Sequence, residues 1–200
     1  MATWGAPRSA MPHSVPMLQE RLEVGPHVAL VLTRVNGYSA ESERTYFTSP
    51  PSPVAKSAFA AMMEARRRAI AMIRPGVSCS ELDSTVTAFL TNEGYAGEDM
   101  RLHRIGHGIG LGTHEGTWLA EGSFDRLDAN MVISIEPGIY LEDLGGFRHS
   151  DTVLVTEDGC EILTHYPTEM ESLVIINWKP IARCKGWLLR RSLRLSNRAS

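Results

Sequence analysis

HGIGLGTHEG (residues 107–116), ISIEPGIY (133–140) and GGFRHSDTVLVTEDG (145–159) are the three segments of the chain that decide its fold. Each is short and mixes apolar residues with glycine and polar residues, a texture that indicates β-strands separated by turns. Asp158-Gly159 is a turn dipeptide, so the last segment and the CEIL that follows it predict a β-hairpin. We therefore expect successive strands through this half of the chain.

A second hairpin is predicted nearer the N-terminus, over His27 to Phe47. The apolar run VALVLTRV is followed by a turn at Asn36-Gly37 and then by the alternating segment YSAESERTYF. Because successive side chains of a strand point to opposite faces, Ser39, Glu41 and Glu43 are expected on one face.

Two helices are predicted between these strand regions. Phe59, Met63, Ile70 and Ile73 recur at helical spacing until Pro75-Gly76 ends the pattern. Ser78 with Glu81 three residues later forms a capping box that opens a second helix, which ends at Gly94. The order of strands, two helices and strands predicts an α+β fold rather than regular strand and helix alternation.

The bulk composition is typical of a globular protein. Hydrophobic residues make up 43% of the 200 residues and charged residues 22%, and no apolar run approaches the roughly 18 residues of a membrane span. The first 16 residues lack the basic and apolar regions of a signal peptide, so we expect a cytoplasmic protein without a membrane partner. Three widely spaced cysteines with no CxxC pair argue against a disulfide framework or a zinc knuckle.

The C-terminal residues 176–200 differ from the rest in charge. They contain no Asp or Glu and seven basic residues: Lys179, Arg183, Lys185, Arg190, Arg191, Arg194 and Arg198. Such a segment can bind nucleic acid or an anionic surface, or it can be a solvated extension. We favour the second interpretation, a poorly ordered basic tail, and do not expect a nucleic-acid partner.

The strand-rich half also carries the residues with chemical potential. Gly106, Gly108, Gly110 and Gly112 alternate, but their spacing is neither GxGxxG nor GxxxxGK[ST] and no helix pattern follows, which argues against a phosphate loop. Glycine instead allows a strand to approach another strand or a ligand closely. Four residues with polar side chains then cluster beside Gly or Pro and predict a functional site: His107, His114, Glu136 and Arg148.

These segments resemble the signatures of the pita-bread hydrolases, the superfamily of methionine aminopeptidase, Xaa-Pro aminopeptidase, prolidase and creatinase. GYSAESERTYF (37–47) and MPHS (11–14) extend the resemblance, which covers about residues 4 to 175. It implies a pita-bread fold over residues 1–175. Members normally carry a longer catalytic domain ahead of the His13 segment, so we expect the domain to be N-terminally truncated. The resemblance also allows a homodimer.

The resemblance implies an altered metal site. The five ligand positions of the metallopeptidase members correspond here to Leu30, Glu41, His107, Glu136 and Ser150. Leu30 has no donor atom, and Ser150 replaces a carboxylate that would bridge two metals. We expect no metal, or one weakly bound divalent ion (Mn, Zn or Co) at Glu41, His107 and Glu136. Asp151 substitutes for the carboxylate only if its strand is bulged, because in a regular strand it points away from Ser150.

Creatinase, the member that works without metal, matches at the altered positions. Its ERT segment corresponds to Glu43-Arg44-Thr45 and its catalytic histidine to His13, although its later histidine corresponds to Ser150 and not to His149. We therefore predict a hydrolase of C–N bonds in a small molecule or dipeptide, such as an Xaa-Pro peptide or an N-substituted amino acid. The alternative is a non-catalytic binding module.

Each candidate residue has a predicted role in such a hydrolase. His13 is the proton shuttle, a task that suits an imidazole near neutral pH. Glu136 and His114 complete the catalytic set, and His107 is placed with the substrate-binding residues. Glu43 binds a cationic group of the substrate, and Arg148, with His114, donates to a carbonyl oxygen or carboxylate. Arg148 can pair with Glu41 or Glu136 at rest, whereas His103 and His149 are expected to be structural or exposed.

Overall fold

The computed structural model describes residues 1–16, 22–95, 97–175 and 180–192. Ten strands and four α-helices make up the described part, together with two short 3-10 helices, η1 (Arg8–Ala10) and η2 (Glu98–Met100). The main sheet has the order β1-β2-β3-β9-β6-β4-β5, with β10 paired to β9, and its paired strands run antiparallel. Helices and strands are segregated along the chain, which confirms the predicted α+β class.

The N-terminal strands form one edge of this sheet. β1 (Ala2–Trp4) pairs with β2 (Pro26–Val35), and β2 pairs along its whole length with β3 (Tyr38–Phe47). The hairpin turn is Asn36-Gly37, and both residues have a positive φ (52° and 90°), the geometry that an Asn-Gly turn favours. The predicted hairpin is therefore present, in the predicted place.

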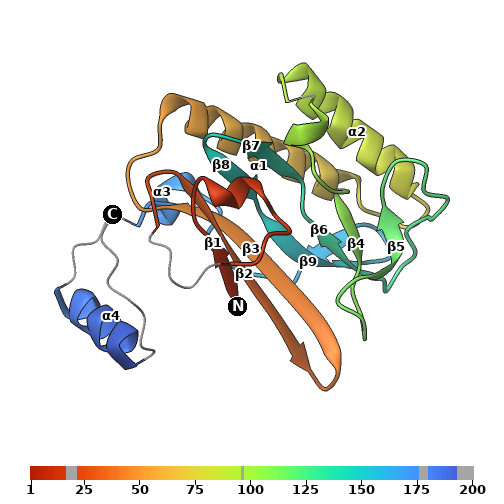
Figure 1. Ribbon diagram of the computed structural model, residues 1–200. Helices are drawn as coiled ribbons and strands as arrows, with labels where there is room; N and C mark the ends of the chain where they lie inside the picture. The colour runs from red at the N-terminus through yellow and green to blue at the C-terminus, as the bar shows by residue number, and fades with distance from the viewer. Residues whose placement is uncertain (17–21, 96, 176–179, 193–200) are drawn as a thin grey trace.

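Two long helices cover one side of the curled sheet (Figure 1). α1 (Pro53–Met72) begins at Ser52, whose hydroxyl accepts a hydrogen bond from Ala55 N–H, and α2 (Cys79–Asn92) begins at Ser78, whose hydroxyl accepts one from Glu81 N–H. Their buried faces pack on alternate residues of the central strands. Ile133, Ile135 and Val153 are fully buried in this core.

The second half supplies the central strands, and each long motif breaks into short pieces. These are β4 (Gly106–Gly108), β5 (Glu115–Leu119), β6 (Val132–Ile135), β7 (Gly138–Leu141), β8 (Gly145–Arg148), β9 (Ser150–Val155) and β10 (Cys160–Ile162). β7 and β8 leave the main sheet and pair with each other. The chain therefore changes sheets at Glu136-Pro137 and again at His149, so residues near those two points lie where the two sheets meet.

The remaining helices are α3 (Met170–Leu173) and α4 (Pro180–Ser192). α4 falls inside the predicted basic tail, while residues 176–179 and 193–200 of that tail lie outside the described residues. The division at residue 175 and the disorder of the tail stay predictions. Within the described ranges, no helix is long and apolar enough to cross a membrane.

Candidate active site

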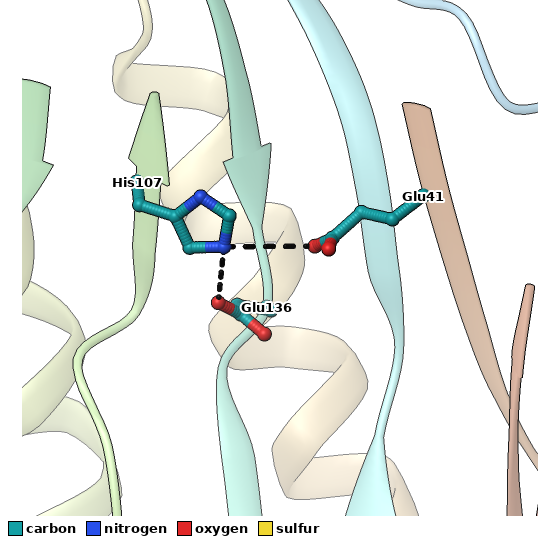
Figure 2. Close-up of side chains that lie close together, drawn as sticks. All are labelled: Glu41, His107 and Glu136. Atoms are coloured by element: carbon teal, nitrogen blue, oxygen red, sulfur yellow. Dashed lines mark ion pairs between the residues drawn. The ribbon is translucent and has the colours of Figure 1, made fainter. Parts of the chain in front are cut away.

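Two carboxylates converge on one imidazole on the side of the sheet opposite the helices. Glu41 comes from β3, His107 from β4 and Glu136 from the residue after β6 (Figure 2). His107 Nε2 lies 3.1 Å from Glu136 Oε1 and 3.8 Å from Glu41 Oε1. Each residue can offer one ligand atom to a metal, and these three atoms lie within 4.8 Å of one another. The predicted group of Glu41, His107 and Glu136 is thus brought together.

The imidazole of His107 is oriented by its own strand. Nδ1 lies 2.9 Å from the carbonyl oxygen of Gly108, which can only accept, so Nδ1 carries a proton and Nε2 faces the carboxylates. Burial lowers the pKa of His107, but its hydrogen bond with Glu136 and the charge of Glu136 outweigh burial and leave the pKa above 6.5. Burial also acts on Glu136, yet His107, His103 and Arg148 together bring the pKa of Glu136 down to about 2. Glu136 is therefore ionised at neutral pH.

Gly106 explains how His107 reaches this position. A Cβ atom at Gly106 would lie 2.1 Å from the carbonyl oxygen of Ser134 on the neighbouring strand β6. Glycine therefore lets β4 and β6 approach closely, which sets the depth at which the His107 ring enters the sheet. This is a structural use of the alternating glycines, as predicted, and not a phosphate loop.

Two serine hydroxyls donate hydrogen bonds to the same carboxylate oxygen of Glu41. Ser134 Oγ donates to Glu41 Oε1, and Ser150 Oγ donates to the same oxygen over 2.7 Å. The backbone of Glu41 is also fixed, because Thr152 Oγ1 accepts from its N–H and donates to its carbonyl oxygen. Glu41 is 5% exposed, so its carboxylate is held by protein donors rather than by water.

A second cluster adjoins the first and is built around a buried ion pair. Arg148 places Nη2 against Glu43 Oε1 and Nε against Glu43 Oε2, and both side chains are buried. Arg148 Nη1 donates to the hydroxyl of Tyr140 and lies 3.2 Å from His103 Nε2. Burial raises the pKa of Glu43, and the adjacent guanidinium of Arg148 opposes burial and favours the ionised carboxylate. Glu43 is therefore the partner of Arg148, and neither of the two suggested partners, Glu41 and Glu136, forms the pair.

His103 and Tyr140 complete this second cluster. His103 Nδ1 faces the carbonyl oxygen of Arg104 at 2.7 Å, so Nε2 is left to accept from the hydroxyl of Tyr140. Burial lowers the pKa of His103 to about 4, which keeps the ring neutral at pH 7. His103 was expected to be structural or exposed, and Tyr140 was not among the predicted site residues. Tyr140 ends the ISIEPGIY motif and His103 lies four residues before His107, so proximity to the motifs was the available signal.

The two remaining candidate histidines lie at the rim. The ring of His114 packs 4.2 Å from that of His107, and burial followed by the charge of His107 lowers the pKa of His114. His13 is exposed, and its ring lies 6.2 Å from that of His103. His114 therefore borders the Glu41, His107 and Glu136 group, and His13 borders the Arg148 cluster.

A close approach of backbone segments positions His13. The hydroxyl of Ser9 accepts from Gly146 N–H at 2.9 Å and donates to the carbonyl oxygen of Pro26. A Cβ atom at Gly146 would lie 2.2 Å from the carbonyl oxygen of Ser9. Trp4 Nε1 donates to the carbonyl oxygen of Ser14, next to His13. The Gly145-Gly146 pair thus lets the N-terminal segment dock beside Arg148.

The two altered ligand positions lie in one cross-strand row. Leu30 on β2 faces Glu43 on β3, and Glu43 faces Ser150 on β9. Directly opposed residues project to the same face of a sheet, so an aliphatic chain and a hydroxyl flank the carboxylate of Glu43. The register runs on regularly to Ser42 and Asp151, which leaves Asp151 on the opposite face. Asp151 pairs there with arginines and does not replace the missing carboxylate.

His149 was expected to be structural or exposed and is fully buried. Its ring lies edge-on to Phe59, and burial lowers its pKa to about 3. A neutral, buried ring packed on an aromatic side chain is a structural residue, which agrees with the first of the two expectations.

Comparison with known proteins adds the family context. Residues 2–157 match the model of metallopeptidase family M24. The Xaa-Pro dipeptidase of Pyrococcus furiosus is 37% identical over 164 residues, which are 82% of this chain and 46% of that protein. The solved prolidase of P. furiosus superposes with a TM-score of 0.76 at 37% identity, over 80% of this chain and 47% of that one. The X-Pro aminopeptidase of Thermotoga maritima gives 0.76 at 35% identity, over 82% and 45%.

The chain spans about half the length of the curated relatives that it matches. The shared fold confirms the pita-bread prediction.

Proposed function

Because the chain belongs to metallopeptidase family M24, we propose that it carries the site of a hydrolase for C–N bonds in a small substrate such as an Xaa-Pro peptide or an N-substituted amino acid. The observation that supports this most directly is the group of Glu41, His107 and Glu136, in which Nε2 of one imidazole faces two carboxylates. The names of the relatives, Xaa-Pro dipeptidase and prolidase, support the substrate class.

The residues do not fit the two-metal centre that is usual in the family. Leu30 contributes no donor atom, and the Ser150 hydroxyl already donates to Glu41 Oε1 together with Ser134. A metal ion at that oxygen would compete with two hydroxyl protons that point at its lone pairs. Three donor atoms remain in reach of a single ion, so we propose at most one, weakly bound, and no step of the reaction depends on it.

The proposed reaction is hydrolysis by general acid and base catalysis. His13 takes a proton from a water molecule, and the water oxygen adds to the carbonyl carbon of the substrate. His114 donates a hydrogen bond to the carbonyl oxygen as negative charge develops on it, and Arg148 stays paired with Glu43. His13 then returns the proton to the leaving nitrogen as the C–N bond breaks. Glu136, ionised at neutral pH, holds His107 and draws a cationic group of the substrate into place.

Glu43 and His107 have binding roles in this proposal. Glu43 already neutralises Arg148, so the two behave as one buried, paired unit that presents little net charge. The carboxylates of Glu41 and Glu136 then leave the neighbouring cluster with an excess of negative charge, which favours a substrate ammonium or guanidinium group over an anion. A cytoplasmic location and a homodimer remain part of the proposal.

Turnover assays test the proposed function. The chain would be incubated with Ala-Pro, creatine and related amides, and release of the amine would be followed for wild type, His13→Ala and His114→Ala. His165→Ala is the matched control, because His165 is exposed and belongs to neither cluster. We expect hydrolysis by wild type and the control, and a loss of at least about 100-fold in kcat without His13, since general base catalysis contributes about 10² or more. Equal rates for His13→Ala and wild type would remove His13 from the mechanism.

A binding module without catalysis is the second candidate function. The observation that favours it is that Arg148 and Glu41 already have protein partners in the resting site. Calorimetry followed by product analysis separates the two functions. A dipeptide that binds and is recovered unchanged after long incubation favours the module, whereas a dipeptide that is consumed excludes it.

A further inference from the structure

Arg148 has little capacity left for a second anion. Its Nε and Nη2 face the two carboxylate oxygens of Glu43, which closes the planar fork that binds a carboxylate at two points. Its Nη1 faces the Tyr140 hydroxyl and His103. A dipeptide with a free C-terminus brings a carboxylate as well as a scissile carbonyl. The carboxylate therefore needs another cation. This inference rests on the proposed function.

Arg104 is a cation placed for that purpose at the rim of the site. It lies two residues before β4 and is exposed, and its carbonyl oxygen accepts from Nδ1 of His103, which ties its backbone to the second cluster. Its guanidinium lies over the ring of Trp118, with 4.3 Å between the guanidinium carbon and the ring centroid. Among the described residues, no carboxylate lies within ion-pair distance of Arg104.

Trp118 brings this guanidinium close to the proposed reaction centre. Its ring lies 6.5 Å from that of His107, and the His107 ring lies 4.2 Å from that of His114. The positive charge of Arg104 is also felt at His114, where it adds to burial and His107 in lowering the pKa. An aromatic platform restricts the guanidinium while its N–H groups, which lie in the plane of the group, stay available for hydrogen bonds.

We propose that Arg104, held on Trp118, binds the carboxylate of the substrate, and that this contact selects peptides and N-substituted amino acids with a free carboxylate. The scissile carbonyl then lies near His114 and Arg148, while the leaving amino acid points toward the β5 edge of the sheet. Arg148 and Glu43 remain paired throughout. The cationic group of the substrate faces Glu41 and Glu136, so the two ends of the substrate meet opposite charges on opposite sides of His107.

The test compares the affinities of two ligands, one with and one without a carboxylate, for wild type and for an Arg104 variant. The affinities of Ala-Pro and of Ala-Pro amide, which lacks the carboxylate, would be measured by calorimetry for wild type and Arg104→Gln, with KM and kcat wherever hydrolysis occurs. Arg104→Lys keeps the charge and loses the fork. Arg34→Gln is the control, because Arg34 is an exposed arginine of the β2–β3 hairpin whose Nε donates to Ser39 and which belongs to neither cluster. Melting temperatures would show that each variant is folded.

We expect Arg104→Gln to weaken Ala-Pro by about 10-fold or more, the effect of losing a charge-assisted hydrogen bond, with kcat little changed. Ala-Pro amide should bind wild type and Arg104→Gln with the same affinity. For Ala-Pro itself, the affinity of Arg104→Lys should lie between those of wild type and Arg104→Gln, and the affinity of Arg34→Gln should match that of wild type. Equal losses for the acid and the amide, or no loss for either, would overturn the carboxylate site and leave the proposed hydrolase intact. A wild-type chain that binds the acid in this pattern without consuming it would retain the site and reject the hydrolase. Failure of wild type to bind either ligand would overturn both.

Discussion

Asp151 offers the sharpest test of how the site is supported, and we predict that Asp151→Asn destabilises the fold by about 3 kcal/mol at pH 7. Asp151 is fully buried on the helix side of β9. Its Oδ1 lies 2.6 Å from Nη2 of Arg44 on β3, and its Oδ2 lies 2.6 Å from Nε of Arg66 on α1. Removing one partner of a buried pair costs about 3–5 kcal/mol. The low end applies because Arg44 keeps the carbonyl oxygens of Glu43 and Ser150 as acceptors, and Arg66 is 11% exposed.

The free-energy cost of Asp151→Asn should depend on pH, because the pKa of Asp151 differs between the folded and the unfolded chain. Burial acts to raise the pKa of Asp151, but Arg66 and Arg44 outweigh it and hold the pKa below 3.8. A lowered folded pKa contributes stability that is present above the unfolded value and is lost as the pH falls through the folded value. The difference between wild type and Asp151→Asn in urea unfolding, followed by fluorescence and circular dichroism, should therefore hold from pH 7 down to about 4 and shrink below it.

A matched control and a clear refutation are available for Asp151. Asp158→Asn changes an exposed acid in the β9–β10 turn and should alter the free energy of unfolding by less than about 0.5 kcal/mol. If Asp151→Asn also costs less than 1 kcal/mol, or if its cost does not change between pH 7 and pH 3, the two ion pairs do not hold α1 to the sheet and the reasoning fails.

Three further outcomes are expected. Glu136→Gln should lower the pKa of His107, because burial then acts without the opposing carboxylate; an NMR titration of the imidazole that shows an unchanged or higher value contradicts this. Gly106→Ala should cost about 1–3 kcal/mol or more in thermal or urea unfolding, since its Cβ would meet the Ser134 carbonyl oxygen; a neutral result means that the strands can separate. Elemental analysis after dialysis should find at most one equivalent of Mn, Zn or Co, and Ser150→Glu should raise that uptake; two equivalents in wild type would show that the site accepts a metal pair.

Short-range sequence patterns predicted most of the helices and strands. The Asn36-Gly37 turn, the alternation that follows it and the capping box at Ser78 are short-range signals, and each element that they indicate lies close to its predicted place. The glycine-rich half was harder, because its motifs break into strands of three to six residues that belong to two different sheets. The changes of sheet at Glu136-Pro137 and at His149 depend on long-range packing that no local pattern encodes.

The site could be predicted by residue type but not by partner. Glu41, His107 and Glu136 meet as expected, yet the pairing of Arg148 with Glu43 depends on contacts between residues 105 positions apart in the chain. Alternation alone makes Glu41 and Glu43 equivalent, and only the register of β3 against β9 places Glu43 opposite Ser150 and near Arg148. His103 gave no periodic signal, because it lies in a loop. His13 was selected from its motif, and the structure leaves its role to be tested.

The row formed by Leu30, Glu43 and Ser150 places both altered ligand positions beside one carboxylate. A second metal at this row would need donors from Leu30 and Ser150, which an aliphatic chain cannot supply and a hydroxyl supplies only weakly. Without that metal, and without another cation nearby, the negative charge of Glu43 would be buried and unpaired, at a cost of several kcal/mol. Arg148 balances the charge of Glu43, and the Ser150 hydroxyl donates a hydrogen bond to the Glu41 oxygen that a metal would otherwise contact. Restoring one carboxylate at Ser150 therefore adds a negative charge to a site whose balance is already set by Arg148, so metal uptake by that variant should be tighter than in wild type yet still limited to one ion.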